Sequence, residues 1–329
     1  MTKPIHLSRR SFLQTTGVGL AASTVGLPAM AATDVNFQLS WLHSVQFGGS
    51  YIAANKGYWA DEGLNVSLTQ GGPNAPVEPP VVSGAALAGI SAADFTAAAV
   101  AQGAPFKIIA VAMQKNPFAI ASLVENPVNE PKDLLGKRIG MAVANTPVLE
   151  ALCTLNGIDI NGIEIVPTQY DPAPLVSKQV DCLLSWETDL PVAMTVQGVE
   201  NTTMLMADFG YALHSQTYIA TEDAVANRRA DLVALLKGEV KGWNDYLADT
   251  DQAAALTLEM FPDAGLDIEA QKLQAARQVP LMFTELTEAN GFGWFTEETI
   301  AANVETLALL GQEVTPDLWD RSLLEEVHG

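Results

Sequence analysis

Residues 35–68 read VNFQLSWLHSVQFGGSYIAANKGYWADEGLNVSL, and this stretch decides the class of fold. From Val35 to Trp41 apolar residues alternate with polar ones, and this period of two predicts a half-buried strand. The pair Gly48-Gly49 interrupts the strand, and residues 50–55 are predicted to form the first turns of a helix. The alternation returns from Leu64 to Leu68 as a second strand. A strand, a helix and a second strand in this order form the unit from which α/β sheets are built.

The same order of elements continues along the chain. Further strands are predicted at residues 87–91, 106–113, 137–143, 164–168, 181–185 and 203–206. The helices between them are predicted at residues 77–82, 94–102, 147–155, 172–178 and 190–197, with Asp94 as a helix cap. Strands that alternate with helices predict parallel sheets covered by helices on both faces. The chain is therefore expected to have an α/β fold.

The strands fall into two sets, which predict two lobes, each with a doubly wound sheet. The chain is expected to cross from the first set to the second near residues 115–125 and to cross back near 215–222. Lobe 1 would then comprise residues 32–116 and 222–329, and lobe 2 residues 117–221. The end of lobe 1 would be a helical C-terminal tail, with helices predicted at residues 223–247, 250–260, 268–279, 296–310 and 316–326.

The chain is acidic, with 38 Asp and Glu against 17 Lys and Arg in 329 residues. This balance argues against nucleic acid as a partner, because phosphate binding needs clustered Lys and Arg. The same argument weighs against docking on anionic lipid. With 48% hydrophobic and 17% charged residues, the composition is that of a packed globular protein.

The first 31 residues have the parts of an export signal. Ser8-Arg9-Arg10-Ser11-Phe12-Leu13-Gln14 precedes a weakly apolar stretch at 16–27, and small residues at 28–32 offer a cleavage site. The paired arginines followed by Phe-Leu resemble the twin-arginine class of signals, which exports folded proteins. We therefore expect residues 1–31 to be a signal peptide, the mature chain to begin near Ala32 and the protein to act in the periplasm. The alternative is an ordinary amphipathic first helix.

The chain has two cysteines, Cys153 and Cys182. Their spacing is not that of a metal site, and no metal or other cofactor is expected. An oxidising compartment would permit a disulfide between them. We expect instead two buried thiols that lie close together in lobe 2 and stay mostly reduced.

Four segments resemble, in order, the substrate-binding proteins of a family that includes alkanesulfonate-binding and thiamine-pyrimidine-precursor-binding proteins. They are WLHSVQFGGSYIA at residues 41–53, KGYWADEGLNV at 56–66, QKNPFA at 114–119 and PKDLLGKRIG at 131–140. The resemblance covers residues 35–220 and, more loosely, the helical tail. It implies the two-lobed periplasmic-binding-protein fold of type II, with a double-crossover hinge. It also implies a protein that delivers a small-molecule ligand to the membrane permease of an ABC importer, and we expect it to be a monomer.

The sequence departs from the family pattern at three positions of the first segment. His43 stands where the family usually has Pro, Ser44 where it has Asn, and Phe47 where the thiamine-pyrimidine branch typically has His. Related fungal thiamine-pyrimidine synthases share the fold and resemble single-turnover enzymes that use a pyridoxal-phosphate-linked lysine and a histidine. Because Phe47 occupies the matching position and export removes the protein from cytosolic cofactor, an enzyme is not expected. A periplasmic sensor or adhesion module is a third reading, which no output domain supports.

Ligands of open α/β sheets bind at the carboxyl ends of the strands. That rule, together with the family segments, selects polar and aromatic residues from both lobes as ligand-binding candidates. In lobe 1 they are Trp41, His43, Gln46, Asn74, Ser91, Asp94 and Gln114. In lobe 2 they are Asn145, Thr146, Tyr170, Asp171, Trp186 and Glu187.

Trp41 is predicted to be the principal stacking plate, because a Trp ring beside a Gly-Gly turn can expose its face to a flat ligand. Asp171 and Glu187, in the other lobe, are predicted to accept hydrogen bonds from a ring amine. For Trp41 and Trp186 the alternative is a place in the core, and for the two carboxylates it is a solvated loop. Residues 145–146 are predicted to donate hydrogen bonds to the ligand, and the alternative for them is to cap the following helix.

Three further residues bear on the shape and charge of the cleft. His43 has two open readings, as a cleft residue and as a partner in a local loop hydrogen bond. Trp294 in the tail either closes the mouth of the cleft or packs in the core. The alternative ligand is a sulfonate, nitrate or related small anion, but such anions need a positive or amide-rich pocket, and Lys115 is the only basic residue of the mature chain predicted near the cleft. The aromatic and acidic candidates favour a neutral or weakly cationic N-heteroaromatic ring, such as a thiamine-precursor pyrimidine or a flavin-like ring system.

Overall fold

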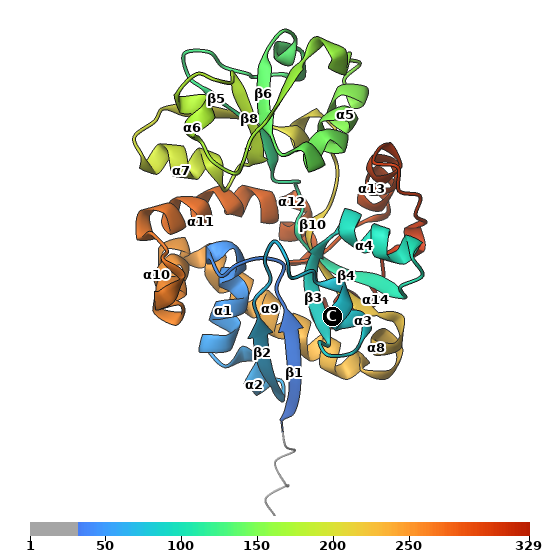
Figure 1. Ribbon diagram of the computed structural model, residues 1–329. Coiled ribbons are helices and arrows are strands. Elements are labelled where there is room, and N and C mark those ends of the chain that lie inside the picture. Colours follow the sequence, from blue (N-terminus) through green and yellow to red (C-terminus); the bar gives the residue numbers. More distant parts are fainter. Residues whose placement is uncertain (1–31) are drawn as a thin grey trace, which may run out of the picture. The chain divides into compact units, whose positions relative to one another are not determined.

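The computed structural model describes residues 32–329, which contain two five-stranded sheets (Figure 1). The first sheet contains β1 (Thr33–Gln38), β2 (Leu64–Thr69), β3 (Ala88–Ala92), β4 (Phe106–Met113) and β10 (Ser215–Thr221), in the order β2-β1-β3-β10-β4. The second contains β5 (Phe118–Leu123), β6 (Arg138–Met141), β7 (Glu164–Pro167), β8 (Cys182–Trp186) and β9 (Asn201–Leu205), in the order β7-β6-β8-β5-β9. We call the first sheet with its helices lobe 1 and the second lobe 2. The predicted signal peptide lies outside the described residues.

Helices connect the strands and make up most of the chain after β10. Those between strands are α1 (Gly48–Asn55), α2 (Tyr58–Asp61), α3 (Glu78–Val82), α4 (Ala93–Ala101), α5 (Thr146–Leu155), α6 (Ala173–Val176) and α7 (Leu190–Val196). Those after β10 are α8 (Glu222–Asn227), α9 (Arg229–Ala248), α10 (Thr250–Met260), α11 (Ile268–Met282), α12 (Glu285–Asn290), α13 (Glu297–Leu309) and α14 (Ser322–His328). Within residues 32–329, no helix combines the length and the apolar character needed to cross a membrane.

The α/β class and the two sheets confirm the prediction, but both sheets are mixed rather than parallel. β1 pairs in parallel with β2 and β3, and β6 pairs in parallel with β7 and β8. β10 runs antiparallel between β3 and β4, and β5 runs antiparallel between β8 and β9. β5 and β10 are the first strands after the two crossings between the lobes. Each runs antiparallel to both of its neighbours in the sheet.

The crossings are shorter than predicted, because most of each predicted crossing is a strand. Residues 118–123 form β5 of lobe 2, and residues 215–221, which were predicted to end lobe 2, form β10 in the sheet of lobe 1. The chain therefore crosses at residues 114–117 and returns at 210–214. Asn116 holds the two crossings together, since its Nδ2 donates to the Leu213 carbonyl at 2.8 Å and to Ser215 Oγ at 3.1 Å.

The core of lobe 1 includes a fully buried carboxyl group, that of Glu239 on α9. Its Oε2 accepts hydrogen bonds from Ser50 Oγ at 3.0 Å, from Trp243 Nε1 at 3.0 Å and from the Tyr218 hydroxyl. Burial raises the pKa of Glu239 to about 7. Helix α1 can approach this cluster because Gly49 has no side chain, and a Cβ there would lie 2.2 Å from the Trp243 ring.

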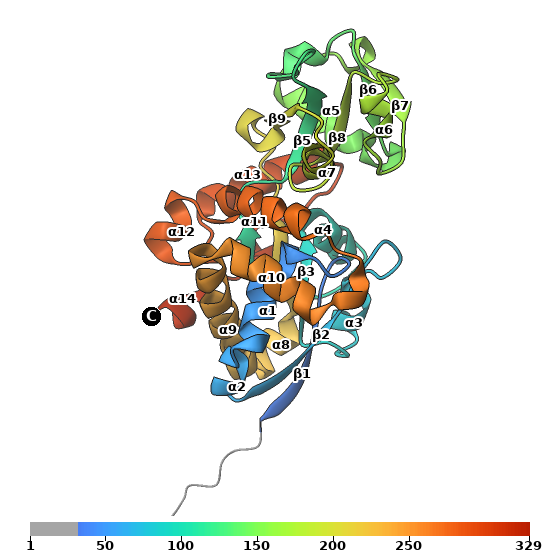
Figure 2. The ribbon, with the colours of Figure 1, turned by 90° about the vertical axis from the view of Figure 1, so that its left-hand side faces the viewer.

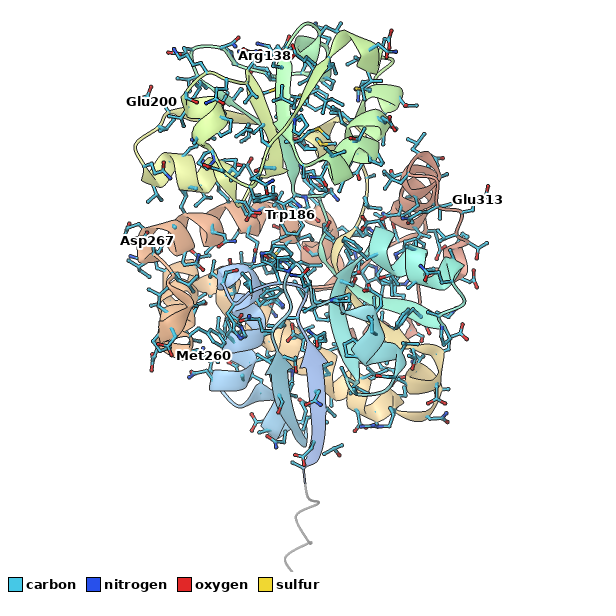
Figure 3. All side chains as sticks on the ribbon, viewed as in Figure 1. Arg138, Trp186, Glu200, Met260, Asp267 and Glu313 are labelled. Atoms are coloured by element: carbon cyan, nitrogen blue, oxygen red, sulfur yellow. The ribbon has the colours of Figure 1, made fainter. Side chains whose placement is uncertain are left out.

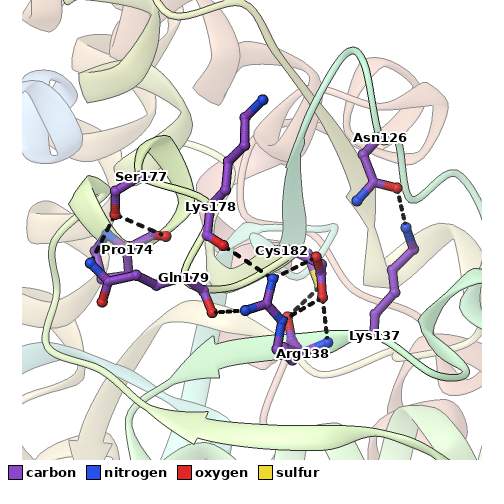
Figure 4. A network of polar contacts seen from close by, with 9 residues as sticks. Asn126, Lys137, Arg138, Pro174, Ser177, Lys178, Gln179 and Cys182 are labelled. Carbon is purple, nitrogen blue, oxygen red and sulfur yellow. Dashed lines mark hydrogen bonds and ion pairs between the residues drawn. The ribbon is translucent and has the colours of Figure 1, made fainter.

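Lobe 2 is tied together where β6 and β8 begin (Figure 4). Arg138 forms an ion pair with Asp181 at 3.0 Å and donates to the Gln179 carbonyl. Cys182 lies beside this network, on β8, and Cys153 lies on α5; both are buried free thiols. Burial raises the pKa of Cys182 to about 12 and also raises that of Cys153. A high thiol pKa disfavours the reactive thiolate, which agrees with the expectation of unreactive buried thiols.

Candidate functional site

A cavity of about 460 Å³ lies where the carboxyl ends of β1 and β2 meet residues of lobe 2 and of the α10–α11 connection. Four parts of lobe 1 and one residue of lobe 2 line it. The lining residues are Trp41, Leu42, His43, Ser44, Gln46, Gln70, Asp189, Asp263, Ala264, Leu266 and Gln274. A cavity of this size accommodates a drug-sized molecule.

The loop after β1 is joined to the loop after β2 by hydrogen bonds. The Gly71 N–H donates to the Trp41 carbonyl at 3.1 Å. A Cβ on Gly71 would lie 2.4 Å from the Leu39 carbonyl oxygen, so this close approach requires glycine. Gln38 is buried and donates from Nε2 to the Leu39 carbonyl at 3.0 Å and to the Thr69 carbonyl at 3.2 Å. These contacts fix the loop so that Trp41 stays 46% exposed beside the cavity.

Helix α11 supports the same loop with buried amide side chains; Figure 2 shows α11 beside α10, which in turn lies against α1. Gln271 Oε1 accepts from the Val45 N–H at 2.7 Å, and Gln278 Nε2 donates to the Gln46 carbonyl at 3.3 Å. Gln271 also donates to Gln274 Oε1 at 3.1 Å. The cavity therefore has amide groups from both the loop and the helix, Gln46 and Gln274, which can donate to or accept from a neutral polar ligand.

His43 lines the cavity and also makes a local hydrogen bond. The two roles that the sequence leaves open for it, cleft residue and hydrogen-bond partner, therefore occur together. Its ring stacks on Phe261 with the ring centroids 3.6 Å apart and the planes 11° apart. Its Nδ1 lies 2.9 Å from the hydroxyl of Tyr51, which is fully buried. Burial lowers the pKa of His43, so the neutral imidazole is favoured.

Lobe 2 contributes Asp189, the residue just before α7. The Tyr170 hydroxyl, which is predicted to contact the ligand, donates to Asp189 Oδ2 at 3.4 Å. Burial raises the pKa of Asp189 to about 6, above the ordinary aspartate value. Asp189 can thus accept a hydrogen bond as the carboxylate or donate one when protonated.

Trp186 ends β8 and Glu187 follows it, and neither is among the residues that line the cavity. Glu187 Oε1 is 3.1 Å from Arg277 Nη1 on α11, an ion pair that joins the two lobes. Trp186, labelled in Figure 3 near the end of lobe 2 that faces lobe 1, packs edge-on against Phe118 with the ring centroids 6.4 Å apart. Lys115, the predicted cation of the cleft, instead pairs with Asp208 at 2.9 Å. Arg277 lies on α11 three residues after Gln274, which lines the cavity, and sequence analysis missed this cation.

The remaining candidates of lobe 1 make contacts within lobe 1 or are exposed. Asn74 is exposed in a tight turn, and the Ser91 hydroxyl donates to Glu78. Asp94 lies in the first turn of α4, inside the helix rather than at the predicted capping position, and burial raises its pKa. Gln114 Nε2 donates to the Val111 carbonyl at 2.7 Å. These four residues are not among those that line the cavity.

Three candidates of lobe 2 make local contacts. The Thr146 hydroxyl donates to the Val143 carbonyl at 2.7 Å, and Asn145 occupies the position before α5. Asp171 Oδ1 accepts from the Ala173 N–H at 2.8 Å at the start of α6 and lines a separate hollow of about 280 Å³. In the tail, Trp294 packs partly buried against the core, with Arg321 5.3 Å from its ring centre.

The ionisable side chains that line the cavity are mainly acidic. Among the described residues that line it, Asp189 and Asp263 carry carboxyl groups and none is Lys or Arg. Residues 32–329 contain no group of three or more His, Cys, Asp or Glu side chains placed to hold a metal ion. The lining residues that sequence analysis missed are Leu42, Ser44, Gln70, Asp189, Asp263, Ala264, Leu266 and Gln274. The first four follow predicted strands, so the strand-end rule could have found them, but the four from the segment 263–274 carry no such signal.

Comparisons with known proteins agree with this architecture. The family model described as NMT1/THI5 like matches residues 44–253. The riboflavin-binding protein RibY of Chloroflexus aurantiacus is 29% identical over 83% of this chain and 81% of that protein. The formylaminopyrimidine-binding protein of Halalkalibacterium halodurans is 22% identical over 72% of this chain and 74% of that protein.

A solved structure shows the same fold. The periplasmic aliphatic sulphonate-binding protein SsuA of Escherichia coli superposes with a TM-score of 0.67 over 85% of this chain and 92% of that chain, at 14% identity. At this identity the likeness shows the fold alone. The prediction of the two-lobed periplasmic-binding-protein fold of type II is confirmed.

Proposed function

The chain belongs to the NMT1/THI5-like family, and from this premise we propose that it is the solute-binding protein of an ABC importer. It captures a small N-heteroaromatic ligand between its lobes and delivers the ligand to a membrane permease. The observation that carries the proposal is the cavity to which both lobes contribute, with Trp41 from lobe 1 and Asp189 from lobe 2. A ligand that contacts both lobes stabilises their closed arrangement, because only that arrangement offers both sets of contacts.

The charge of the cavity favours a neutral or weakly cationic ligand. A sulfonate or nitrate would bring a negative charge beside Asp189 and Asp263 without a lining cation to offset it. Trp41 offers an exposed aromatic face on which a flat ring can stack. The names of the riboflavin-binding and formylaminopyrimidine-binding relatives point to the same chemistry.

We assign the recognition of the ligand edge to Asp189 rather than to the predicted Asp171 and Glu187. Asp171 is engaged at the start of α6, and Glu187 is paired with Arg277. Asp189 lines the cavity, and its carboxyl group can bind a ring amine or a ring nitrogen. Trp41 and Asp189 therefore divide stacking and polar recognition between the two lobes.

The proposal includes the setting in which the protein acts. We propose a monomeric, exported protein that works in the periplasm, reached by the twin-arginine route, and that binds its ligand without converting it. Phe47, at the position that matches the histidine of the synthases, is fully buried and packs against Tyr51, so it offers a ligand no reactive group.

Thermal-shift screening followed by calorimetric titration tests the ligand class. The exported protein is screened against riboflavin, formylaminopyrimidine, the hydroxymethyl pyrimidine precursor of thiamine, an alkanesulfonate and nitrate. A ligand that binds only the folded state raises the melting temperature, so at least one heterocycle should do so and the two anions should not. If an anion binds and no heterocycle does, the ligand is an anion and not an N-heteroaromatic ring. If a bound pyrimidine is chemically converted, the protein is an enzyme.

A further inference from the structure

The environment of His43 determines which of its ring nitrogens carries the proton. The Tyr51 hydroxyl lies 2.9 Å from Nδ1, and within residues 32–329 this nitrogen is the one acceptor that the structure gives to that hydroxyl. Tyr51 is fully buried, and an O–H group buried without an acceptor is unfavourable. The hydroxyl therefore donates to Nδ1, which leaves the proton of the neutral ring on Nε2.

The position of the His43 ring leaves its protonated nitrogen, Nε2, available to a ligand. Stacking on Phe261 fixes the plane of the ring, with an interplanar angle of 11°, and the contact with Tyr51 occupies one edge. His43 lines the cavity, and Nε2 lies on the other side of the five-membered ring. The polar group that His43 can offer to a ligand is therefore an N–H donor.

We propose that His43 is a specificity-determining residue which donates from Nε2–H to a hydrogen-bond acceptor of the ligand, a carbonyl oxygen or a pyridine-type ring nitrogen. The inference rests on the proposed function and deepens it, because it selects heterocycles with an acceptor on the edge that faces lobe 1. Stacking alone would admit any flat ring, whereas a fixed donor rejects rings that leave it unpaired. Asp189 would then recognise a second edge of the ligand from lobe 2.

The tautomer is tested first, without ligand. Long-range ¹H–¹⁵N NMR spectra of the labelled protein distinguish the two neutral tautomers, and the His43→Gln variant assigns the signal. We expect the wild type to carry the proton on Nε2 and Tyr51→Phe, which keeps the ring and removes the hydroxyl, to shift His43 toward a mixture of tautomers. A proton on Nδ1 in the wild type, or an unchanged single tautomer in Tyr51→Phe, would overturn the inference.

Binding is then measured by calorimetry with riboflavin and with the hydroxymethyl pyrimidine as probes. His43→Ala should weaken binding of the heterocycle that binds best by about tenfold, and His43→Gln, which retains an N–H donor near the Nε2 position, should stay within about threefold of the wild type. Equal loss in both variants, or no loss in His43→Ala, contradicts the role of His43 and leaves the proposed function intact. Failure of riboflavin, formylaminopyrimidine and the hydroxymethyl pyrimidine alike to bind the wild type contradicts the proposed function itself.

Discussion

Arg277 on α11 and Glu187 after β8 form an ion pair that joins the two lobes, with Nη1 and Oε1 3.1 Å apart. Arg277 also reaches Thr195 on α7, with Nη2 3.4 Å from Oγ1. The side chains of Arg277 and Glu187 are 23% and 18% exposed, so water screens the pair only in part. The pair exists only where α11 and lobe 2 are close, and it therefore favours the closed arrangement.

Replacing Arg277 with Met should weaken ligand binding while the protein stays folded. The loss should be on the order of 1 kcal/mol, because a partly exposed pair contributes modestly and salt reduces it further. Calorimetry at low and high salt measures the loss, and small-angle scattering reports any opening of the lobes. Lys272→Met is the matched control, since Lys272 lies on the same helix and pairs with Asp251 within lobe 1 at 3.7 Å. Equal affinities of Arg277→Met, Lys272→Met and the wild type would show that the pair does not contribute to closure.

Trp41→Ala should weaken binding by about 1–3 kcal/mol and leave the melting temperature almost unchanged. Trp41 is 46% exposed, so its removal takes away a stacking surface without opening a cavity in the core. Trp294→Ala provides the contrast, because Trp294 packs against the core and its loss should lower stability without changing affinity. A sharp fall in melting temperature with unchanged affinity in Trp41→Ala would assign Trp41 to the core.

The buried carboxyl group of Glu239 predicts a loss of stability with rising pH. Its pKa in the folded protein is raised to about 7, so its neutral form favours folding. That contribution is fully present below the pKa of the unfolded chain, near 4.3, and is lost as the pH rises through 7. Urea unfolding at pH 5 and pH 8 should therefore differ by on the order of 2 kcal/mol more in the wild type than in Glu239→Gln. The same difference in both proteins would mean that Glu239 does not titrate in this range.

Arg9 and Arg10 give a prediction about export that concerns the chain before the described residues. Changing both to Lys keeps the charge and removes the paired-arginine signal, so the twin-arginine route should no longer accept the protein. Fractionation of cells, with the mature N-terminus determined by mass spectrometry, measures the effect. Export of the double variant at the wild-type rate would point to another route.

Cys153 and Cys182 should remain reduced in the purified protein. Both are buried, and the pKa of each is raised, so the thiolate that starts disulfide formation is scarce. The intact mass, measured without reductant, should equal that of two free thiols. A mass lower by two protons would establish a disulfide.

The elements with a clear period could be predicted from the sequence, and those beside the hinge could not. Residues 250–260 were predicted as a helix and form α10. The sequence pattern predicts connections between the lobes at the segments that form β5 and β10, because a strand between two others shows no alternation when both of its faces are covered. Pairing with strands 60 or more residues away decides their structure, as the pairs Ser122–Cys182 and Tyr218–Ala110 illustrate.

Some residues of the candidate site could be predicted from the sequence, and others could not. Trp41, His43 and Gln46 follow a strand in the sequence, so a rule about strand ends could name them, and all three line the cavity. Gln274 and Arg277 lie within α11, where polar residues on a helix usually face solvent, and only the packing of that helix brings them to the cleft. Asp171 illustrates the opposite error, since a residue at a strand end can be engaged by its own turn.

The place of β10 between β3 and β4 has a consequence for biosynthesis. Its residues leave the ribosome only after the whole of lobe 2 has been made, so the sheet of lobe 1 stays incomplete until then. Lobe 2, which is continuous in sequence, can collapse first, while the unpaired edges of β3 and β4 wait for a distant partner. Such edges are exposed to aggregation in the meantime. Chains that stop before residue 215 should therefore be insoluble or bound by chaperones, and completion of β10 should be the step that commits the molecule to its native state.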